Sequence, residues 1–87
     1  MRIARKAQAG TMQSSDLMVA LEPADGLSVE IASTVKKQFD HLIHAVVSDV
    51  LASHGVTAGR VRVTDRGALD YAIRARVETA LQRAAER

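Results

Sequence analysis

Residues 17–31 have the sequence LMVALEPADGLSVEI. From Leu17 to Glu22, strongly apolar residues occupy every second position, a pattern typical of a half-buried β-strand. A second alternating run extends from Leu27 to Ile31. Between the runs, Pro23–Gly26 contains the proline and the glycine of a turn, because proline presets φ and glycine accepts a positive φ. The pattern predicts that the two runs pair as an antiparallel hairpin.

Downstream of this stretch, the apolar residues recur with a helical period. The predicted buried stripe consists of Val35, Phe39, Leu42, Ile43, Val46, Val47, Val50 and Leu51. Such spacing is typical of an amphipathic helix. Ser33 or Thr34 is the expected N-cap, and Gly55 is the expected C-terminal stop. Leu42 and Val46 lie in the middle of the stripe, and we therefore expect both to be buried.

The last third of the chain predicts a strand and then a helix. Val61 and Val63 alternate with arginines, which indicates a short strand. Asp65 is the expected cap of a helix from about Gly67. The predicted buried face of this helix consists of Leu69, Ile73, Val77, Ala80, Leu81 and Ala84. The unit from Leu27 to Val63 is long enough for a right-handed parallel crossover.

These elements together predict an α+β fold. The expected order is strand, strand, helix, strand, helix, with a weak additional strand at 7–12 in front. Two amphipathic helices should cover one face of a small mixed β-sheet. A chain of 87 residues is the length of a single domain, and we assign residues 1–87 to one.

The segment between the first two predicted strands carries the main candidate for chemistry. Gln13–Asp16 is polar and fits a hairpin loop, which exposes Ser14 to another enzyme. Serine is also an ordinary turn residue. Asp16 is expected to hold the turn by accepting backbone hydrogen bonds. Recognition of Asp16 by an enzyme that modifies the loop is the alternative.

Blocks along nearly the whole chain resemble one family in their order and spacing. The sequence is similar to the acyl carrier protein of citrate lyase, the gamma subunit of that complex. The blocks that carry the resemblance are Gly10-Thr11, Ser14, Asp16, Glu22-Pro23, Ser33–Phe39, Asp49–Ala52, Asp65–Asp70 and Ile73–Glu78.

The resemblance implies a covalent prosthetic group. In the family, the serine that matches Ser14 carries a phosphoribosyl-dephospho-coenzyme A arm through a phosphodiester. The residue after that serine is usually glycine, whereas this chain has Ser15. A hairpin tip often needs one residue with a positive φ, which that glycine suits, so we expect Ser15 to adopt this geometry at some strain. We carry the attachment role to Ser14 by position and keep Ser15 as the alternative. The protein is then a carrier and not itself a catalyst.

The resemblance also implies partners. They are the alpha subunit, an acyl transferase, the beta subunit, an acyl lyase, and the transferase that installs the arm. The expected location is the cytoplasm. A carrier of citramalate lyase or of malonate decarboxylase is the nearest alternative, and the Val35–Phe39 block favours the lyase type. The sequence of this chain does not distinguish a citrate lyase from a citramalate lyase, because the partner subunits select the substrate.

The composition limits other classes of function. The chain has no cysteine, which excludes disulfides and thiolate metal sites. His41 and His44 lack an obvious third metal ligand. The N-terminal residues and the last third are basic, so a small nucleic-acid-binding module is an alternative of a different class. Tyr71 is the only aromatic ring near those arginines, which disfavours base stacking. The arginines are also candidates for contacts with phosphates of the arm or with acidic partners.

Overall fold

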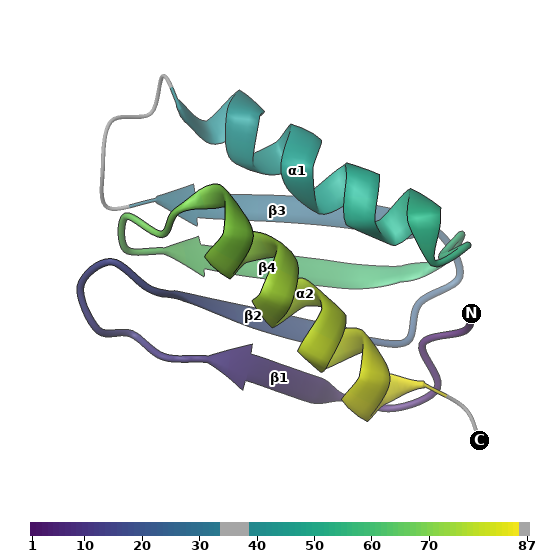
Figure 1. The fold of residues 1–87 in the computed structure, drawn as a ribbon. Coiled ribbons are helices and arrows are strands. Elements are labelled where there is room, and N and C mark those ends of the chain that lie inside the picture. The colour runs from purple at the N-terminus through teal and green to yellow at the C-terminus, as the bar shows by residue number, and fades with distance from the viewer. Residues whose placement is uncertain (34–38, 86–87) are drawn as a thin grey trace.

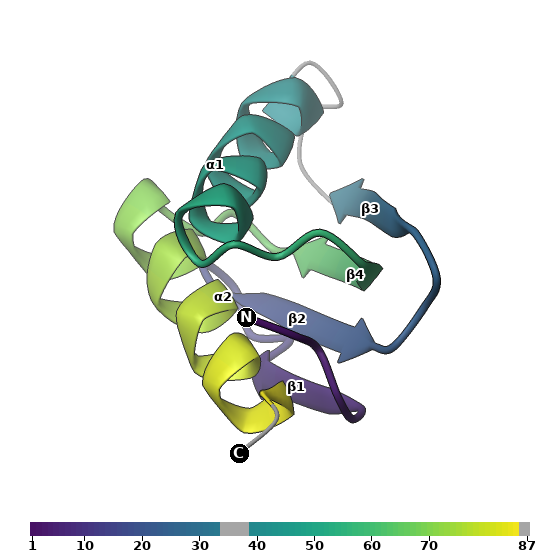
Figure 2. The same ribbon diagram turned by 90° about the vertical axis from the view of Figure 1, so that its right-hand side faces the viewer.

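The chain forms six elements in a computed structural model that describes residues 1–33 and 39–85. They are β1 (Ala7–Gly10), β2 (Leu17–Glu22), β3 (Leu27–Ser33), α1 (Asp40–Ser53), β4 (Gly59–Asp65) and α2 (Asp70–Ala84). The strands form one sheet in the order β1-β2-β4-β3 (Figure 1). Both helices cover the same face of this sheet (Figure 2). The predicted α+β class and the additional N-terminal strand are therefore confirmed.

Strand β4 lies in the middle of the sheet, between β2 and β3. It pairs antiparallel with β2, where Val63 faces Val19, and parallel with β3, where Val61 faces Val29. The predicted hairpin of β2 and β3 is therefore wrong, whereas the parallel connection through α1 is confirmed. The 23–26 segment links strands that are not neighbours, and Gly26 is not among the glycines with a positive φ.

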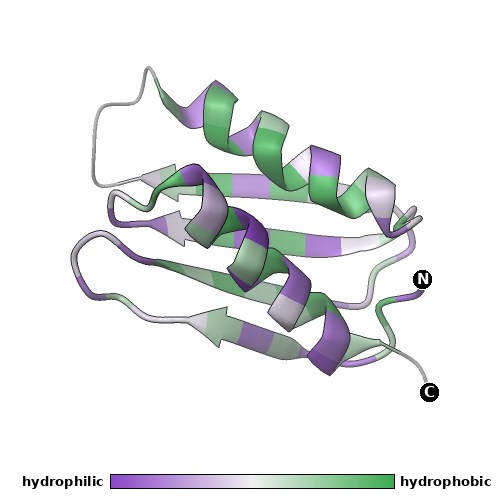
Figure 3. Cartoon of the chain, in the orientation of Figure 1, coloured by the Kyte–Doolittle hydropathy of each residue, from purple (hydrophilic) through white to green (hydrophobic). Residues whose placement is uncertain are grey.

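The core lies between the sheet and the two helices. Along β4, buried residues alternate with exposed arginines, which Figure 3 shows as green and purple segments. The side chains that are almost completely buried include Leu17, Val19, Val47, Leu51, Val61, Val63, Val77 and Leu81. The core is aliphatic, and no helix of residues 1–33 and 39–85 lies on the opposite face of the sheet (Figure 2). No helix in residues 1–33 and 39–85 is long and apolar enough to cross a membrane.

Helix α1 ends at its predicted stop. Gly55 has a φ of 67° and donates its N–H to the carbonyl of Ala52, while Val56 donates to Leu51. This pair of bonds is the Schellman arrangement. The expected N-cap is not observed, because Ser33 belongs to β3 and α1 begins at Asp40. Thr34 and Val35 lie outside the described residues.

Asp65 is buried at the end of β4 and stabilises the turn that follows. Its carboxylate accepts the backbone N–H of Gly67 at 3.1 Å and that of Ala68 at 3.0 Å. The prediction placed Asp65 as the cap of a helix from about Gly67. Helix α2 instead begins at Asp70, with Leu69 as its N-cap. Asp65 therefore caps the 66–69 turn and not the helix itself.

The N-terminal halves of both helices are less buried than predicted. Leu42 in α1 is 52% exposed, and Leu69 before α2 is 61% exposed, so both assignments to the core were wrong. Val46 is half-buried. The buried residues of α1 begin with Ile43 and are concentrated in its second half. The predicted stripe of α1 is therefore on the correct side of the helix, but the rest of the protein buries only part of it.

The exposure difference between two leucines of α1 gives a matched test of this core. Replacement of Leu51, which is 1% exposed, by alanine should lower the free energy of unfolding by about 2–5 kcal/mol. The same replacement at Leu42 should cost about 0.5 kcal/mol or less, because its side chain is largely in solvent. Urea unfolding followed by circular dichroism measures both values. Equal losses for the two variants would contradict this description of α1.

Candidate functional site

Ser14 lies on the loop that joins β1 to β2, at residues 11–16. Both Ser14 and Ser15 are exposed. The loop is at the same end of the molecule as the β4–α2 connection and the start of α1 (Figure 1). The predicted exposed position of Ser14 in a loop between two strands is therefore confirmed.

The loop closes because of one glycine, one bond from Thr11 to the first residue of β2, and one turn bond within the loop. Gly10 has a φ of 105°, and a side chain there would collide with the carbonyl of Leu17. Thr11 donates its N–H to that same carbonyl at 3.1 Å. On the other side of the tip, Asp16 donates its N–H to the carbonyl of Gln13 at 3.2 Å. Only glycine fits position 10 without distorting the hairpin.

The loop is also fastened to the end of β4. The N–H of Ser15 donates to the carbonyl of Arg66 at 2.8 Å, and the N–H of Arg66 donates to the carbonyl of Asp16 at 2.8 Å. These reciprocal bonds continue the β2–β4 pairing past Leu17 and Asp65. The backbone around Ser14 is therefore held on both sides of the tip.

Ser15 is strained. Its φ is 65°, and it is the one non-glycine residue with a positive φ among residues 1–33 and 39–85. A non-glycine residue in this region costs about 1–3 kcal/mol. The sequence-based expectation that the residue after Ser14 has left-handed backbone geometry is confirmed. Glycine would satisfy this geometry without strain.

Asp16 is the centre of a hydrogen-bond network under the loop. Its carboxylate accepts the hydroxyl of Thr11 at 2.6 Å and the N–H of Leu17 at 2.7 Å. The Arg76 guanidinium donates to both carboxylate oxygens, from Nη2 at 2.9 Å and from Nε at 3.2 Å. The predicted role of Asp16 in the turn is thus confirmed. Arg76 was not singled out as its partner.

This network makes the Asp16 carboxyl group a stronger acid. The hydrogen bond from Thr11, followed by those from Arg76 and the N–H of Leu17, lowers the pKa of Asp16 to about 2. All three interactions favour the ionised carboxylate. Arg76 comes from α2, so the network also connects the loop to that helix. At neutral pH, Asp16 is therefore permanently charged and holds the loop against α2.

Most of the C-terminal arginines have partners within the chain. Arg74 bonds to Asp49 and Asp70, each at 2.7 Å, and Arg83 donates to the carbonyl of Gln8 at 2.8 Å. Among the described residues, no hydrogen bond or ion pair engages the guanidinium of Arg66. Arg66 is therefore the cation beside the loop with capacity for an external anion.

The histidines do not form a metal centre. His41 and His44 are exposed on α1. Within residues 1–33 and 39–85, no group of three or more histidine, cysteine, aspartate or glutamate residues is arranged to hold a metal ion. These histidines line the flank of the helix.

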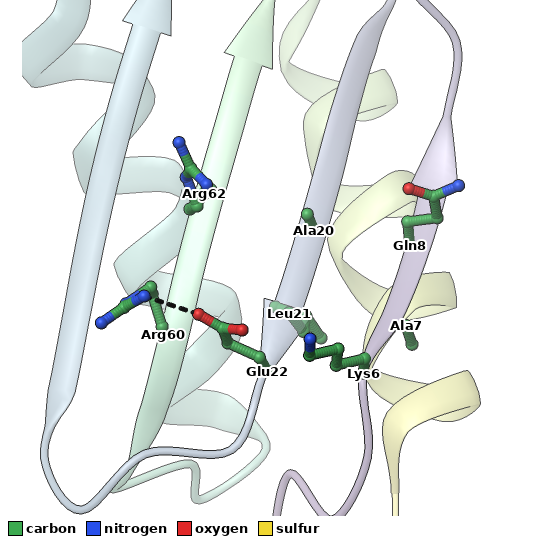
Figure 4. Close-up of a pocket in the computed structure, with 8 residues that line it drawn as sticks. All are labelled: Lys6, Ala7, Gln8, Ala20, Leu21, Glu22, Arg60 and Arg62. Atoms are coloured by element: carbon green, nitrogen blue, oxygen red, sulfur yellow. Dashed lines mark hydrogen bonds and ion pairs between the residues drawn. The ribbon is translucent and has the colours of Figure 1, made fainter.

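Two hollows of the surface differ in chemistry and position. One of about 330 Å³ lies on the sheet face away from the helices (Figure 4). It contains Lys6, the Arg60–Glu22 ion pair at 2.7 Å, and Arg62. Lys6 precedes β1 and Glu22 ends β2, so this hollow is at the end of the sheet opposite Ser14. The second hollow, an apolar groove of about 680 Å³, lies between the starts of the two helices, at the Ser14 end.

Comparison with known proteins identifies relatives of the whole chain. The sequence profile of the malonate decarboxylase delta subunit (MdcD) family matches residues 4–84. The chain is 50% identical over 86 residues to the citrate lyase acyl carrier protein of Haemophilus influenzae, and the match covers 99% of this chain and 90% of the relative.

Solved structures are similar at lower identity. A chain of the Pseudomonas malonate decarboxylase hetero-tetramer in complex with malonate has a TM-score of 0.78 and 26% identity, over 95% of this chain and 87% of that chain. The RNase P protein of Staphylococcus aureus has a TM-score of 0.56 and 15% identity, over 86% of this chain and 81% of that chain. This second likeness is one of fold alone.

The Asp16 network predicts a measurable titration. The Asp16 carboxyl should titrate at about pH 2, so its stabilising effect is complete above about pH 4 and is lost as the pH falls towards 2. Replacement of Thr11 by valine should raise the midpoint, because it removes the strongest of the three interactions. Carbon-13 NMR of the Asp16 carboxyl measures this midpoint.

The control for this titration is an exposed threonine outside the loop. Replacement of Thr57 by valine should leave the Asp16 midpoint unchanged, because Thr57 lies in the α1–β4 connection. An Asp16 midpoint of about 2 in the Thr11→Val variant would show that the described network does not set the pKa.

Proposed function

Because the chain belongs to the acyl carrier protein family of citrate lyase and malonate decarboxylase, we propose that it is the carrier subunit of a citrate lyase and bears its prosthetic arm on Ser14. The observation that carries the proposal is the Ser14 hydroxyl, exposed at the tip of a loop whose backbone is fixed on both sides. The choice of citrate lyase rests on citrate lyase acyl carrier proteins that are about 50% identical to this chain. The malonate decarboxylase chain is only 26% identical.

As a member of this family, the protein is a carrier and not a catalyst by itself. Its role is to present one hydroxyl for modification and then to hold the modified residue steady. A thiol on a tethered arm reaches successive active sites at a high effective concentration, without release into solution. The loop supports this role, because a stiff base limits the volume that the arm explores.

The residues around Ser14 fit a phosphodiester-linked group. The two serine hydroxyls are exposed, and Arg66 supplies a cation on the neighbouring segment. A guanidinium favours phosphate oxygens, with which it makes charge-assisted hydrogen bonds. The proposed group is phosphoribosyl-dephospho-coenzyme A, whose thiol carries the acyl group. Arg66 would contact the phosphate at the base of this group.

The assignment of Ser14 over Ser15 rests on backbone geometry. Ser15 adopts the left-handed conformation that the family satisfies with glycine, and its N–H is bonded to Arg66. Ser15 thus has a structural role in the turn, which leaves the Ser14 hydroxyl for chemistry. The arm-installing transferase and the alpha and beta subunits of the lyase are the proposed partners.

The alternatives have less support. A carrier for citramalate lyase would need the same loop and arm, so this chain alone does not distinguish it. A nucleic-acid-binding role has no support from the family. Arg74, Arg76 and Arg83 are held by acceptors of the chain itself, which reduces the charge available for phosphates of a nucleic acid.

Attachment is tested by mass. Co-expressed with its matching transferase, the protein should gain the mass of one phosphoribosyl-dephospho-coenzyme A group. Ser14→Ala should remain folded and gain nothing, because the accepting hydroxyl is gone. Intact mass spectrometry and peptide mapping provide the measurement. An unmodified wild-type protein under these conditions would count against the carrier function.

Ser15→Gly is the matched variant for the neighbouring hydroxyl. It should still be modified and should melt at or above the temperature of the wild type, because glycine relieves the strained φ. If peptide mapping instead places the group on Ser15, and Ser14→Ala is still modified, the positional assignment is wrong while the carrier function survives.

A further inference from the structure

The apolar groove at the Ser14 end has no role in the carrier function as described so far. Its walls are the first turns of α1 and α2, and its rim includes three largely exposed apolar side chains, Phe39, Leu42 and Leu69. Val46 and Ile73 form part of its lining. Its volume of about 680 Å³ is in the range of sites for small molecules. Exposed apolar surface of this kind commonly marks a binding site.

The groove and the attachment loop share one connection of the chain. Arg66 bonds to the backbone of Ser15 and of Asp16, and the next residues, Gly67 and Ala68, line the groove. From Ser14, the path along Ser15 and Arg66 to Gly67 is at most about 15 Å, from the spacing of consecutive Cα atoms and one hydrogen bond. A group attached to Ser14 by a short spacer therefore reaches the groove.

We propose that this groove holds the adenine ring of the arm attached at Ser14. The proposal rests on the function proposed above, which supplies the arm. In that arm, a phosphoribosyl unit is the spacer between the serine and the adenosine, so adenine is the flat ring nearest to the attachment point. The apolar walls suit its faces, and the Asp70 carboxylate at the rim suits its amino group.

Charge complementarity supports the same occupant. The phosphodiester at Ser14 is negative, and Arg66, a cationic residue, belongs to the segment that joins the loop to the groove. No hydrogen bond or ion pair among the described residues engages this guanidinium. An anionic linker followed by an apolar ring thus matches a cation followed by an apolar groove. A citryl group at the far end of the arm matches less well, because its carboxylates would lose hydration in such a groove.

A docked adenine has a consequence for the carrier. It fixes the base of the arm at the helix starts, and only the thiol-bearing end remains free to move. Each immobilised rotatable bond lowers the volume in which the thiol moves, which raises its effective concentration at an active site within reach. The carrier would then restrict the directions in which the arm extends.

NMR of the modified protein tests the proposal without an activity assay. Adenine H2 and H8 should show nuclear Overhauser contacts to the methyl groups of Leu42, Val46 and Ile73. These methyl groups should shift between the unmodified and modified proteins. The double variant Leu42→Ser, Leu69→Ser should lose at least half of the contact intensity, because it replaces exposed apolar rim residues with small polar ones.

Leu27→Ser is the control, since Leu27 is 44% exposed and pairs with Gly59 at the other end of the sheet. It should leave the contacts unchanged. Shifts confined to residues 13–16, without adenine contacts to the groove, would overturn the proposal. If the adenine contacts disappear on dilution, the adenine in the groove belongs to the arm of a second copy, and this result would also overturn the proposal. Failure of the wild type to gain mass is recorded first, and it rejects the carrier function itself.

Discussion

The double pairing of β4 is the constraint on which the structure depends. Residues 59–65 bond to β2 on one edge and to β3 on the other, and Val61 and Val63 are almost completely buried. The same strand ends in Asp65, which organises the turn before α2, and leads to Arg66, which bonds to the attachment loop. Fold and site are therefore connected through one strand. The loop has its shape because β4 is in the centre and not at an edge.

The central position of β4 also explains the error in the predicted topology. Alternation identified β2, β3 and β4, because it depends on which faces are buried, and this is a local property. Pairing is not local. Residues 23–26 have the composition of a tight turn, yet they link β2 to a strand on the far side of β4. The burial of the strands contains the missing information, since every second residue of β4 is buried whereas the residues of β3 are at most half-buried. A poorly buried strand belongs at an edge.

The helices show a second limit of periodicity. The apolar stripe gave the correct side of α1 and α2, because a helical period of 3.6 fixes which residues share a face. It did not indicate how far the opposing surface extends. Ile43, Val47 and Leu51 are covered, but Leu42 and Leu69 project beyond the contact between the helices and the sheet. Apolar residues that are not needed by the core are therefore left together where the two helices begin, and this is what forms the groove.

The site divides in the same way into local and long-range parts. The exposed loop position of Ser14, the strain at Ser15 and the turn role of Asp16 depend on neighbouring residues. All three were therefore predicted from the sequence. Arg76 is 60 positions from Asp16, and its contact exists only because α2 packs over β1 and β2. The roles of the loop residues are thereby separated, since Ser15 and Asp16, which follow Ser14, carry the bonds to Arg66 after β4 and to Arg76 of α2. The proposed modification at Ser14 would add a large anionic group without breaking any of these bonds, so the domain would hold the arm with the fold that it has before attachment.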